Sequence, residues 1–177
     1  METRRLGLIA ILVPLLAGAN EGDCSVKISE HFIRGQSMSE LFQPETRIEA
    51  EEGWYACHPV KRDDIVLVRL PHRKDPLIKI AKVIPGDRFE LKSLSGASYQ
   101  LLINRQVAKT PKGQSYLFSG SAYKMLSLYE KDFKGVMPKD TYFVFGTQPG
   151  GSLDSAKYGP ITHAALMARV RATAHIQ

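Results

Sequence analysis

Short apolar runs, separated by turn-forming residues, dominate the hydrophobic pattern of this chain. A β-branched run covers residues 65–70 and ends at Pro71, and a second run covers 77–84 and ends in Pro85-Gly86-Asp87. Both runs predict strands that are bounded by turns. Three further strands are expected at 88–91, 99–107 and 141–146. The first two of them form a hairpin across a turn at 95–98. The close spacing of these strands predicts a mostly β domain.

The remaining segments carry weaker patterns, and no internal repeat is evident. In chain order they predict a polar lead-in at 20–30, a long excursion with one short strand at 39–60, one or two helical turns at 122–128, a Gly- and Ser-rich loop at 146–160, and a closing strand or short helix at 161–174. The length of 177 residues is that of one domain, or of one domain with a subdomain.

Residues 1–19 have the pattern of an export signal. Arg4 and Arg5 precede an apolar run at 6–16, and Ala17-Gly18-Ala19 supplies the small residues that a signal peptidase accepts. The apolar stretch is shorter than the ~20 residues that a membrane-spanning helix prefers. A cleaved signal and a short retained anchor both stay open, and either one puts residues 20–177 outside the cytoplasm.

Charge and cysteine content narrow the function classes. The net charge of +6 is spread along the chain without a basic cluster, so nucleic-acid binding is not expected, while attraction to an anionic membrane surface is compatible. The five histidines show no metal-ligand spacing, and neither a metal nor a cofactor is expected. Cys24 and Cys57 form a disulfide in an oxidising compartment or stay as two thiols, and the sequence leaves both open.

A serine and two lysines are the candidate chemistry. Ser37 follows Gly35-Gln36, where the backbone can approach a bound peptide closely. Lys79 and Lys82 lie in the apolar run at 77–84, and strand alternation predicts that they point to opposite faces, with at least one of them buried. Burial lowers the pKa of a lysine, and the neutral amine can then act as a base for a serine nucleophile.

Two other features bear on this interpretation. A Ser-His-Asp triad is disfavoured, because Ser39 stands where the G-x-S-x-G elbow needs its second glycine and His31 lies on no recognisable framework. The loop at 146–155 is either a solvent loop or a loop that folds back, so that Ser152 holds the active-site lysine by a hydrogen bond.

The order of these motifs resembles the type I signal peptidase family over about residues 31–170. The resemblance is carried by four segments: Gly35-Gln36-Ser37-Met38, Arg62-Asp63-Asp64 with the strand after it, Lys79 with Pro85-Gly86-Asp87, and Ser152-Leu153-Asp154-Ser155. It implies that Ser37 is the nucleophile and Lys79 the general base, since the base stands six residues before the proline. It also implies that Ser152 supports the lysine, that Asp154 is structural, and that Gly35 occupies a position where some members carry an oxyanion-binding serine.

This chain departs from the family pattern at several positions. Ile80 replaces an arginine, Gly146-Thr147-Gln148 replaces Gly-Asp-Asn, and Ala156 replaces the arginine that would pair with Asp154. These departures leave the Ser37 and Lys79 assignment intact.

The resemblance implies a signal-peptidase-like catalytic β core in residues 20–177, with a small β subdomain inserted at 88–136. It implies an endopeptidase that cleaves signal peptides from exported preproteins through an acyl-enzyme and without a cofactor. Bound substrate is expected to extend along a strand edge beside Ser37, in contact with Gln36, Met38 and Ile78. The implied location is the extracytoplasmic side of the cytoplasmic membrane, with a single N-terminal anchor, or the periplasm after cleavage at Ala19.

Two alternatives stay open beside this function. One is a pilin-maturing peptidase of conjugation systems, which shares the serine and lysine pair. The other is an inactive exported peptide-binding module. A self-cleaving repressor domain is disfavoured by the export signal and by Pro85-Gly86-Asp87.

Overall fold

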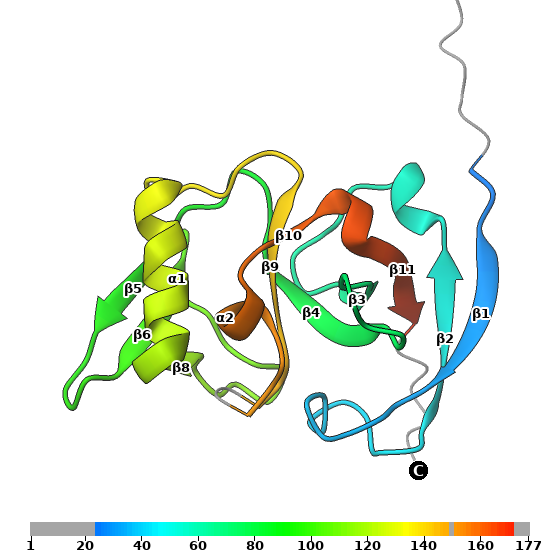
Figure 1. The fold of residues 1–177 in the computed structure, drawn as a ribbon, viewed down its shortest axis with the longest axis horizontal. Coiled ribbons are helices and arrows are strands. Elements are labelled where there is room, and N and C mark those ends of the chain that lie inside the picture. Colours follow the sequence, from blue (N-terminus) through cyan, green and yellow to red (C-terminus); the bar gives the residue numbers. More distant parts are fainter. Residues whose placement is uncertain (1–23, 149–150, 172–177) are drawn as a thin grey trace, which may run out of the picture.

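The computed structural model describes residues 24–148 and 151–171, which form two β-rich lobes side by side (Figure 1). The chain is mostly β, as expected from the spacing of its apolar runs. The predicted export signal at 1–19 lies outside the described residues. Among the helices within those ranges, none has the length and apolarity needed to span a bilayer.

The larger lobe contains a seven-stranded antiparallel sheet in the order β1-β2-β11-β3-β4-β9-β10. Its strands are β1 (Lys27–Phe32), β2 (Arg47–Glu52), β3 (Ile65–Val68), β4 (Leu77–Val83), β9 (Thr141–Phe145), β10 (Ile161–Thr162) and β11 (Leu166–Arg171). The predicted strands at 65–70, 77–84 and 141–146 are confirmed as β3, β4 and β9. Short 3-10 helices, η1 (Trp54–Ala56) and η2 (His163–Ala165), and the helix α2 (Ser155–Tyr158) lie in its connections.

The smaller lobe contains β5 (Phe89–Ser93), β6 (Tyr99–Ile103), β7 (Gln106–Val107), β8 (Leu117–Phe118) and the helix α1 (Gly120–Asp132). The predicted hairpin is confirmed, since β5 pairs with β6 from Phe89 opposite Ile103 to Ser93 opposite Tyr99. The expected continuation through 104–107 is wrong. Asn104 and Arg105 adopt positive φ angles, so the chain reverses and β7 pairs back onto β6.

Two other elements differ from expectation. The helix α1 has 13 residues rather than one or two turns, because Tyr123, Leu126 and Tyr129 recur at helical spacing and pack against the core of the smaller lobe. Segment 20–30, expected as a polar lead-in, contains most of β1. Within residues 24–148 and 151–171 this edge strand pairs only with β2, and it keeps much of its surface in water, so it needs no apolar run to form.

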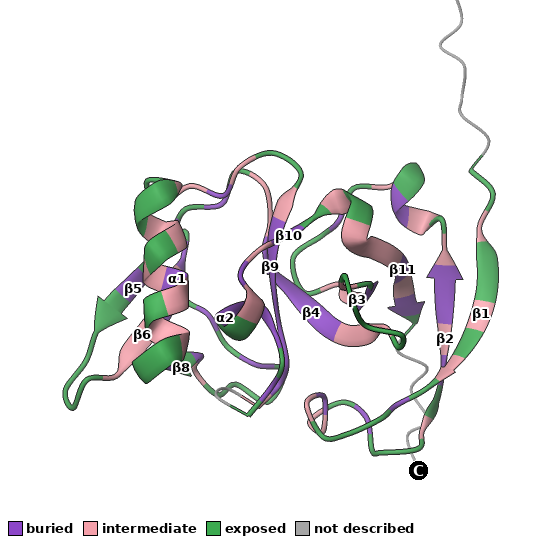
Figure 2. Cartoon of the chain, in the orientation of Figure 1, coloured by how far each residue is buried: buried purple, intermediate pink, exposed green. Residues whose placement is uncertain are grey.

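Apolar residues cover both faces of the larger sheet. Leu67 and Ile80 belong to a cluster on one face, while Val66, Val68 and Ala81 belong to a cluster on the other. A third cluster fills the smaller lobe and includes Phe143 and Phe145 of β9. The strands β4 and β9, which connect the lobes, are therefore buried along most of their length (Figure 2).

A β-bulge interrupts the pairing of β4 with β9. Ala81 lies opposite Val144 and Val83 lies opposite Phe143, so Lys82 is an extra residue between two paired positions. Regular alternation is lost there. Residue parity therefore does not decide the faces of Lys79 and Lys82, although their side chains contact different segments, Ser37 for Lys79 and Lys109 for Lys82. Both lysines are buried, with 2% and 5% of their surface exposed, respectively.

Cys24 and Cys57 are joined by a disulfide, with their Cα atoms 5.8 Å apart. This decides between the two states that the sequence left open. The bond ties the chain just before β1 to the end of η1. It therefore fixes one end of β1, an edge strand whose one neighbour among the described strands is β2.

Candidate active site

Ser37 lies in a tight turn between β1 and β2, built over residues 35–42. Gly35 enters the turn with φ +77°, and the N–H groups of Leu41 and Phe42 both donate to the carbonyl oxygen of Met38 at 2.9 Å. The Met38 side chain is buried in the core of the larger lobe. The side chain of Ser37 stays partly exposed, so the turn is anchored by its neighbour and presents the hydroxyl to solvent.

Lys79 of β4 brings its amine to the Ser37 hydroxyl. Its Nζ donates hydrogen bonds to Ser37 Oγ at 2.8 Å and to the Ile78 carbonyl oxygen at 2.9 Å. The pKa of Lys79 is lowered from its ordinary 10.5 to about 8, chiefly by burial; the negative charge of Asp154 opposes this shift, and the positive charge of Arg73 adds to it. A substantial neutral fraction near physiological pH follows from this environment.

The loop after β9 holds the Ser37 turn from a second side. The Thr147 N–H donates to the Ser37 carbonyl oxygen at 2.7 Å, and the Glu40 N–H donates to Thr147 Oγ1 at 3.3 Å. Gly146 approaches the turn so closely that a Cβ atom there would lie 2.5 Å from the Ser37 carbonyl oxygen and 2.5 Å from Ser152 Oγ. Position 146 therefore admits only glycine without a shift of the backbone.

Ser152 lies near the site but does not make the expected contact with Lys79. Its Oγ is buried and makes no hydrogen bond to Lys79, although its hydroxyl acts on the nearby carboxylate of Asp154. The expectation of a Ser152 to Lys79 hydrogen bond is therefore wrong for this structure. The lysine instead places its second hydrogen bond on the adjacent carbonyl of Ile78.

Asp154 is bound by backbone groups. Its carboxylate accepts hydrogen bonds from the N–H of Gly146 at 3.1 Å and of Ala156 at 3.0 Å, and it caps the N-terminus of α2. Burial raises the pKa of Asp154, while these N–H groups, the Ser152 hydroxyl and the charge of Lys79 oppose the rise. The carboxylate thus finds partners in the backbone although alanine replaces the arginine of the family pattern.

A groove of about 330 Å³ opens beside the Ser37 hydroxyl. One wall is formed by residues 30–34 and the other by residues 75–79, and Lys79 lies in its lining. Of the three residues expected to contact substrate, Met38 and Ile78 line the groove, whereas Gln36 is exposed and lies outside the lining. Ser37 is thus reached through an open channel between two segments of extended chain.

Several residues that support the site carry no clear sequence signal. Thr147 replaces the family's aspartate, and its N–H donates a hydrogen bond to the Ser37 turn. The Tyr116 hydroxyl donates to the Gly146 carbonyl oxygen at 3.0 Å from another part of the chain. Arg73 lines the groove and acts on the Lys79 charge. These contacts join segments that are far apart in sequence, and polar loop contacts have no periodicity that would reveal them.

The Ser37 hydroxyl contacts the buried Lys79 amine in the lining of a groove. Such a site has the elements needed for nucleophilic attack on a peptide bond. The family comparison agrees with this class of site. The model of the family described as signal peptidase, peptidase S26, matches residues 6–174, and the chain belongs to this family. Membership supports a peptidase that acts in signal-peptide processing.

Among solved structures, the chain is similar to a signal peptidase I from Enterococcus faecalis V583, determined at 2.27 Å resolution. The sequences are 19% identical, the match covers 64% of this chain and 98% of that one, and the TM-score is 0.46. No match was found among curated proteins.

Proposed function

We propose that this protein is a serine endopeptidase that cleaves N-terminal signal peptides from exported preproteins, with Ser37 as nucleophile and Lys79 as general base. The observation that carries the proposal is the 2.8 Å contact between Ser37 Oγ and the buried Nζ of Lys79. A general base must lie within hydrogen-bond reach of the proton that it removes, and its pKa must allow a neutral form.

In the proposed reaction, neutral Lys79 accepts the Ser37 hydroxyl proton as Ser37 Oγ attacks the scissile carbonyl carbon. The resulting ammonium of Lys79 returns that proton to the leaving amine when the C–N bond breaks. Water then attacks the acyl-enzyme ester, Lys79 again takes a proton, and Ser37 leaves as its hydroxyl. The serine is regenerated, and no external cofactor takes part.

The negative oxygen that forms on the substrate carbonyl needs a hydrogen-bond donor. Gly35 offers no side chain for this role, and no atom lies within 4 Å of the position that its Cβ would occupy. We assign the role to the backbone N–H of Ser37, aided by water in the open space beside Gly35.

The groove supports an extended peptide substrate. Residues 30–34 and 75–79 offer strand-like walls to which a peptide backbone can add hydrogen bonds. Met38 and Ile78 form apolar lining next to the hydroxyl, so a small substrate side chain is accepted there while a large one meets side chains already packed in the core.

We also propose that residues 88–136 form the inserted subdomain of this enzyme. This range holds β5 to β8 together with α1, and Arg88 and Val136 form a bridge at its base. The chain enters it from β4 and returns to β9, which are neighbours in the larger sheet. The subdomain thus leaves and rejoins the catalytic core next to the Lys79 strand.

We place the domain on the extracytoplasmic side of the cytoplasmic membrane, with residues 1–19 as its anchor, or in the periplasm after their removal. The Cys24–Cys57 disulfide supports an oxidising compartment. Signal-peptide-bearing preproteins at the membrane surface are the proposed partners.

Incubation with a preprotein tests the function. Residues 20–177 are mixed with a preprotein whose signal ends in small residues, and mass spectrometry locates the cut. We expect a cut after a small residue with the wild type and with Ser95→Ala, an exposed serine in the β5–β6 turn, and none with Ser37→Ala. Cleavage by Ser37→Ala at the wild-type rate would exclude Ser37 as nucleophile. Cleavage of a pilin precursor alone would favour the pilin-maturing alternative, and binding without cleavage would favour the inactive module.

A further inference from the structure

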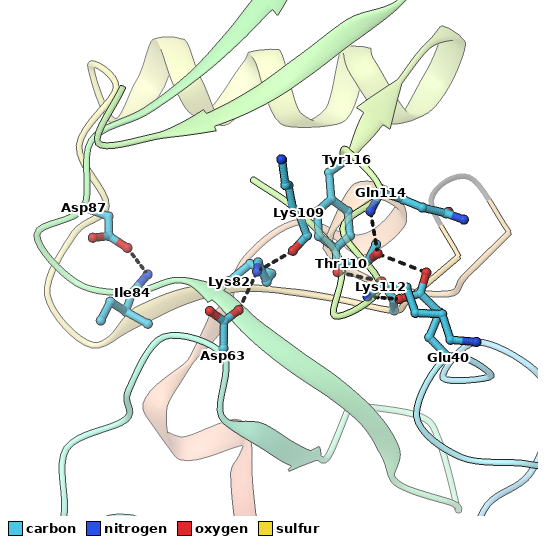
Figure 3. Close-up of polar contacts among 11 residues, drawn as sticks. Glu40, Asp63, Lys82, Ile84, Asp87, Lys109, Thr110, Lys112, Gln114 and Tyr116 are labelled. Carbon is cyan, nitrogen blue, oxygen red and sulfur yellow. Dashed lines mark hydrogen bonds and ion pairs between the residues drawn. The ribbon is translucent and has the colours of Figure 1, made fainter. Parts of the chain in front are cut away.

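The loop at 109–116, which we call the brace loop, joins β7 to β8 in the smaller lobe and reaches across to the larger one (Figure 3). Two side chains of the larger lobe, Glu40 and Lys82, form hydrogen bonds to it. Neither residue lines the groove beside Ser37, and neither belongs to the motifs that identify the family. Each lies three residues after a member of the proposed catalytic pair, since Glu40 follows Ser37 and Lys82 follows Lys79.

Glu40 accepts two hydrogen bonds from the brace loop. Its Oε1 accepts from the Thr110 hydroxyl at 3.0 Å, and its Oε2 accepts from the Lys112 N–H at 3.0 Å. The loop is shaped for this contact, since Thr110 is buried and its Oγ1 also accepts the Gln114 N–H at 3.2 Å. The Glu40 carboxylate therefore ties the Ser37 turn to a preorganised part of the smaller lobe.

Lys82 binds the same loop at Lys109, the residue directly before Thr110. Its Nζ donates to the Lys109 carbonyl oxygen at 2.8 Å and to the carboxylate of Asp63, and it lies 5.6 Å from the centroid of the Tyr116 ring (Figure 3). The β-bulge of β4 occurs at this lysine. β4 thus carries Lys79 to the Ser37 turn and Lys82 to the brace loop.

The brace loop also contacts the third segment of the site. Lys109 and Ser115 form a bridge that closes the loop, and the next residue, Tyr116, donates its hydroxyl to the Gly146 carbonyl oxygen. Gly146 in turn lies against the Ser37 carbonyl oxygen. One loop of the smaller lobe therefore touches all three segments that build the site.

We propose that Glu40 and Lys82 are positioning residues that act through the brace loop. Glu40 fixes the Ser37 turn to Thr110 and Lys112 of the loop, and Lys82 fixes β4 to the adjacent Lys109. The loop thus sets the distance between Ser37 Oγ and Lys79 Nζ. This inference rests on the proposed function of that pair. Because the contacts of Glu40 and of Lys82 are both needed to hold this distance, loss of either contact releases it. Loss of both should therefore lower the rate no more than loss of one.

Steady-state cleavage of a preprotein by the full-length chain tests this. The variants are Glu40→Gln, Lys82→Met and the two combined, and the matched controls are the exposed Glu45→Gln and Lys92→Met. We expect each single variant to lose about tenfold in kcat with KM within about twofold, because misplacement of reacting groups slows chemistry more than binding. The double variant should match the singles, and the pH at which the rate is half-maximal should not move.

Three results would overturn the inference: singles no slower than their controls, a loss that appears in KM, or losses that multiply in the double variant. If Glu40→Gln does not fold, Thr110→Val cuts the same contact from the loop side, and Thr110→Ser should restore the rate. A wild-type rate that does not depend on Ser37 would instead refute the proposed function, so the two failures are distinguishable.

Discussion

Titration of Lys79 is expected to govern the activity of this protein. With a pKa of about 8, roughly one Lys79 amine in ten is neutral at pH 7, whereas the ordinary value of 10.5 would leave about three in ten thousand. If the neutral amine is the base, kcat/KM should rise about tenfold per pH unit below about pH 8 and level off above it. The measurement is the initial rate of preprotein cleavage at low substrate concentration from about pH 5.5 to 9.5.

Burial of Lys79 also lowers the free energy of unfolding at low pH, because the folded protein binds the Lys79 proton less tightly than the unfolded chain does. The unfolded chain holds the Lys79 proton more tightly than the folded protein does, so the free energy of unfolding rises with pH between about 8 and 10.5 and is lowered by about 3 kcal/mol below this window. Between about pH 6.5 and 9.5, the wild type should therefore gain about 2 kcal/mol over Lys79→Met in urea unfolding. Buried Tyr116, whose pKa burial raises, contributes equally to both proteins.

A flat rate profile across this range would refute the lysine base. Parallel stability curves for the wild type and Lys79→Met would refute the burial penalty. The two measurements are independent, because the first reports on turnover and the second on the free energy of an amine removed from water. If the midpoint of the rate profile falls at the pH where the stability of the wild type begins to rise, both effects come from titration of the Lys79 amine.

Three other changes have definite expected outcomes. Lys79→Arg should abolish cleavage while keeping the fold, because a guanidinium stays protonated at any working pH; turnover above background would contradict the base assignment. Gly146→Ala should lower the free energy of unfolding by about 1–3 kcal/mol and slow cleavage at least tenfold, because its Cβ meets the Ser37 carbonyl oxygen, and wild-type values in urea unfolding and kinetics would show that the turn yields easily. Replacing Cys24 and Cys57 together by serine should cost about 3–4 kcal/mol for a loop of 33 residues, and an unchanged urea midpoint would mean that the disulfide adds no constraint.

The sequence predicted those parts of the fold whose pattern is local. Apolar runs bounded by turns marked β3, β4 and β9, and the spacing between Lys79 and Pro85 singled out the lysine that the structure puts beside Ser37. The role of that pair stays a prediction until turnover is measured. β1 was missed because an edge strand with one face in water needs few apolar residues.

Other features depend on contacts between distant segments. The bulge at Lys82 follows from the pairing of β4 with β9, which no single strand reveals. The contact of Glu40 with Thr110 joins positions 70 residues apart. Ser152 was expected to bond Lys79 from motif order alone, yet side-chain direction within a Gly-rich loop is set by its surroundings and not by the order of motifs.

The position of β11 in the larger sheet has a consequence for biosynthesis. It lies between β2 and β3 and pairs with both, so it joins the β1–β2 part of the sheet, which carries Ser37, to the β3–β4 part, which carries Lys79. Since β11 comprises Leu166–Arg171, the ribosome must translate past residue 171 before this strand can join the two parts of the sheet. Pairings between segments so distant in sequence also form late in folding. A nascent chain that already contains Ser37 therefore does not yet have Lys79 aligned with it, and the pair that we propose as catalytic is complete only once β11 is inserted.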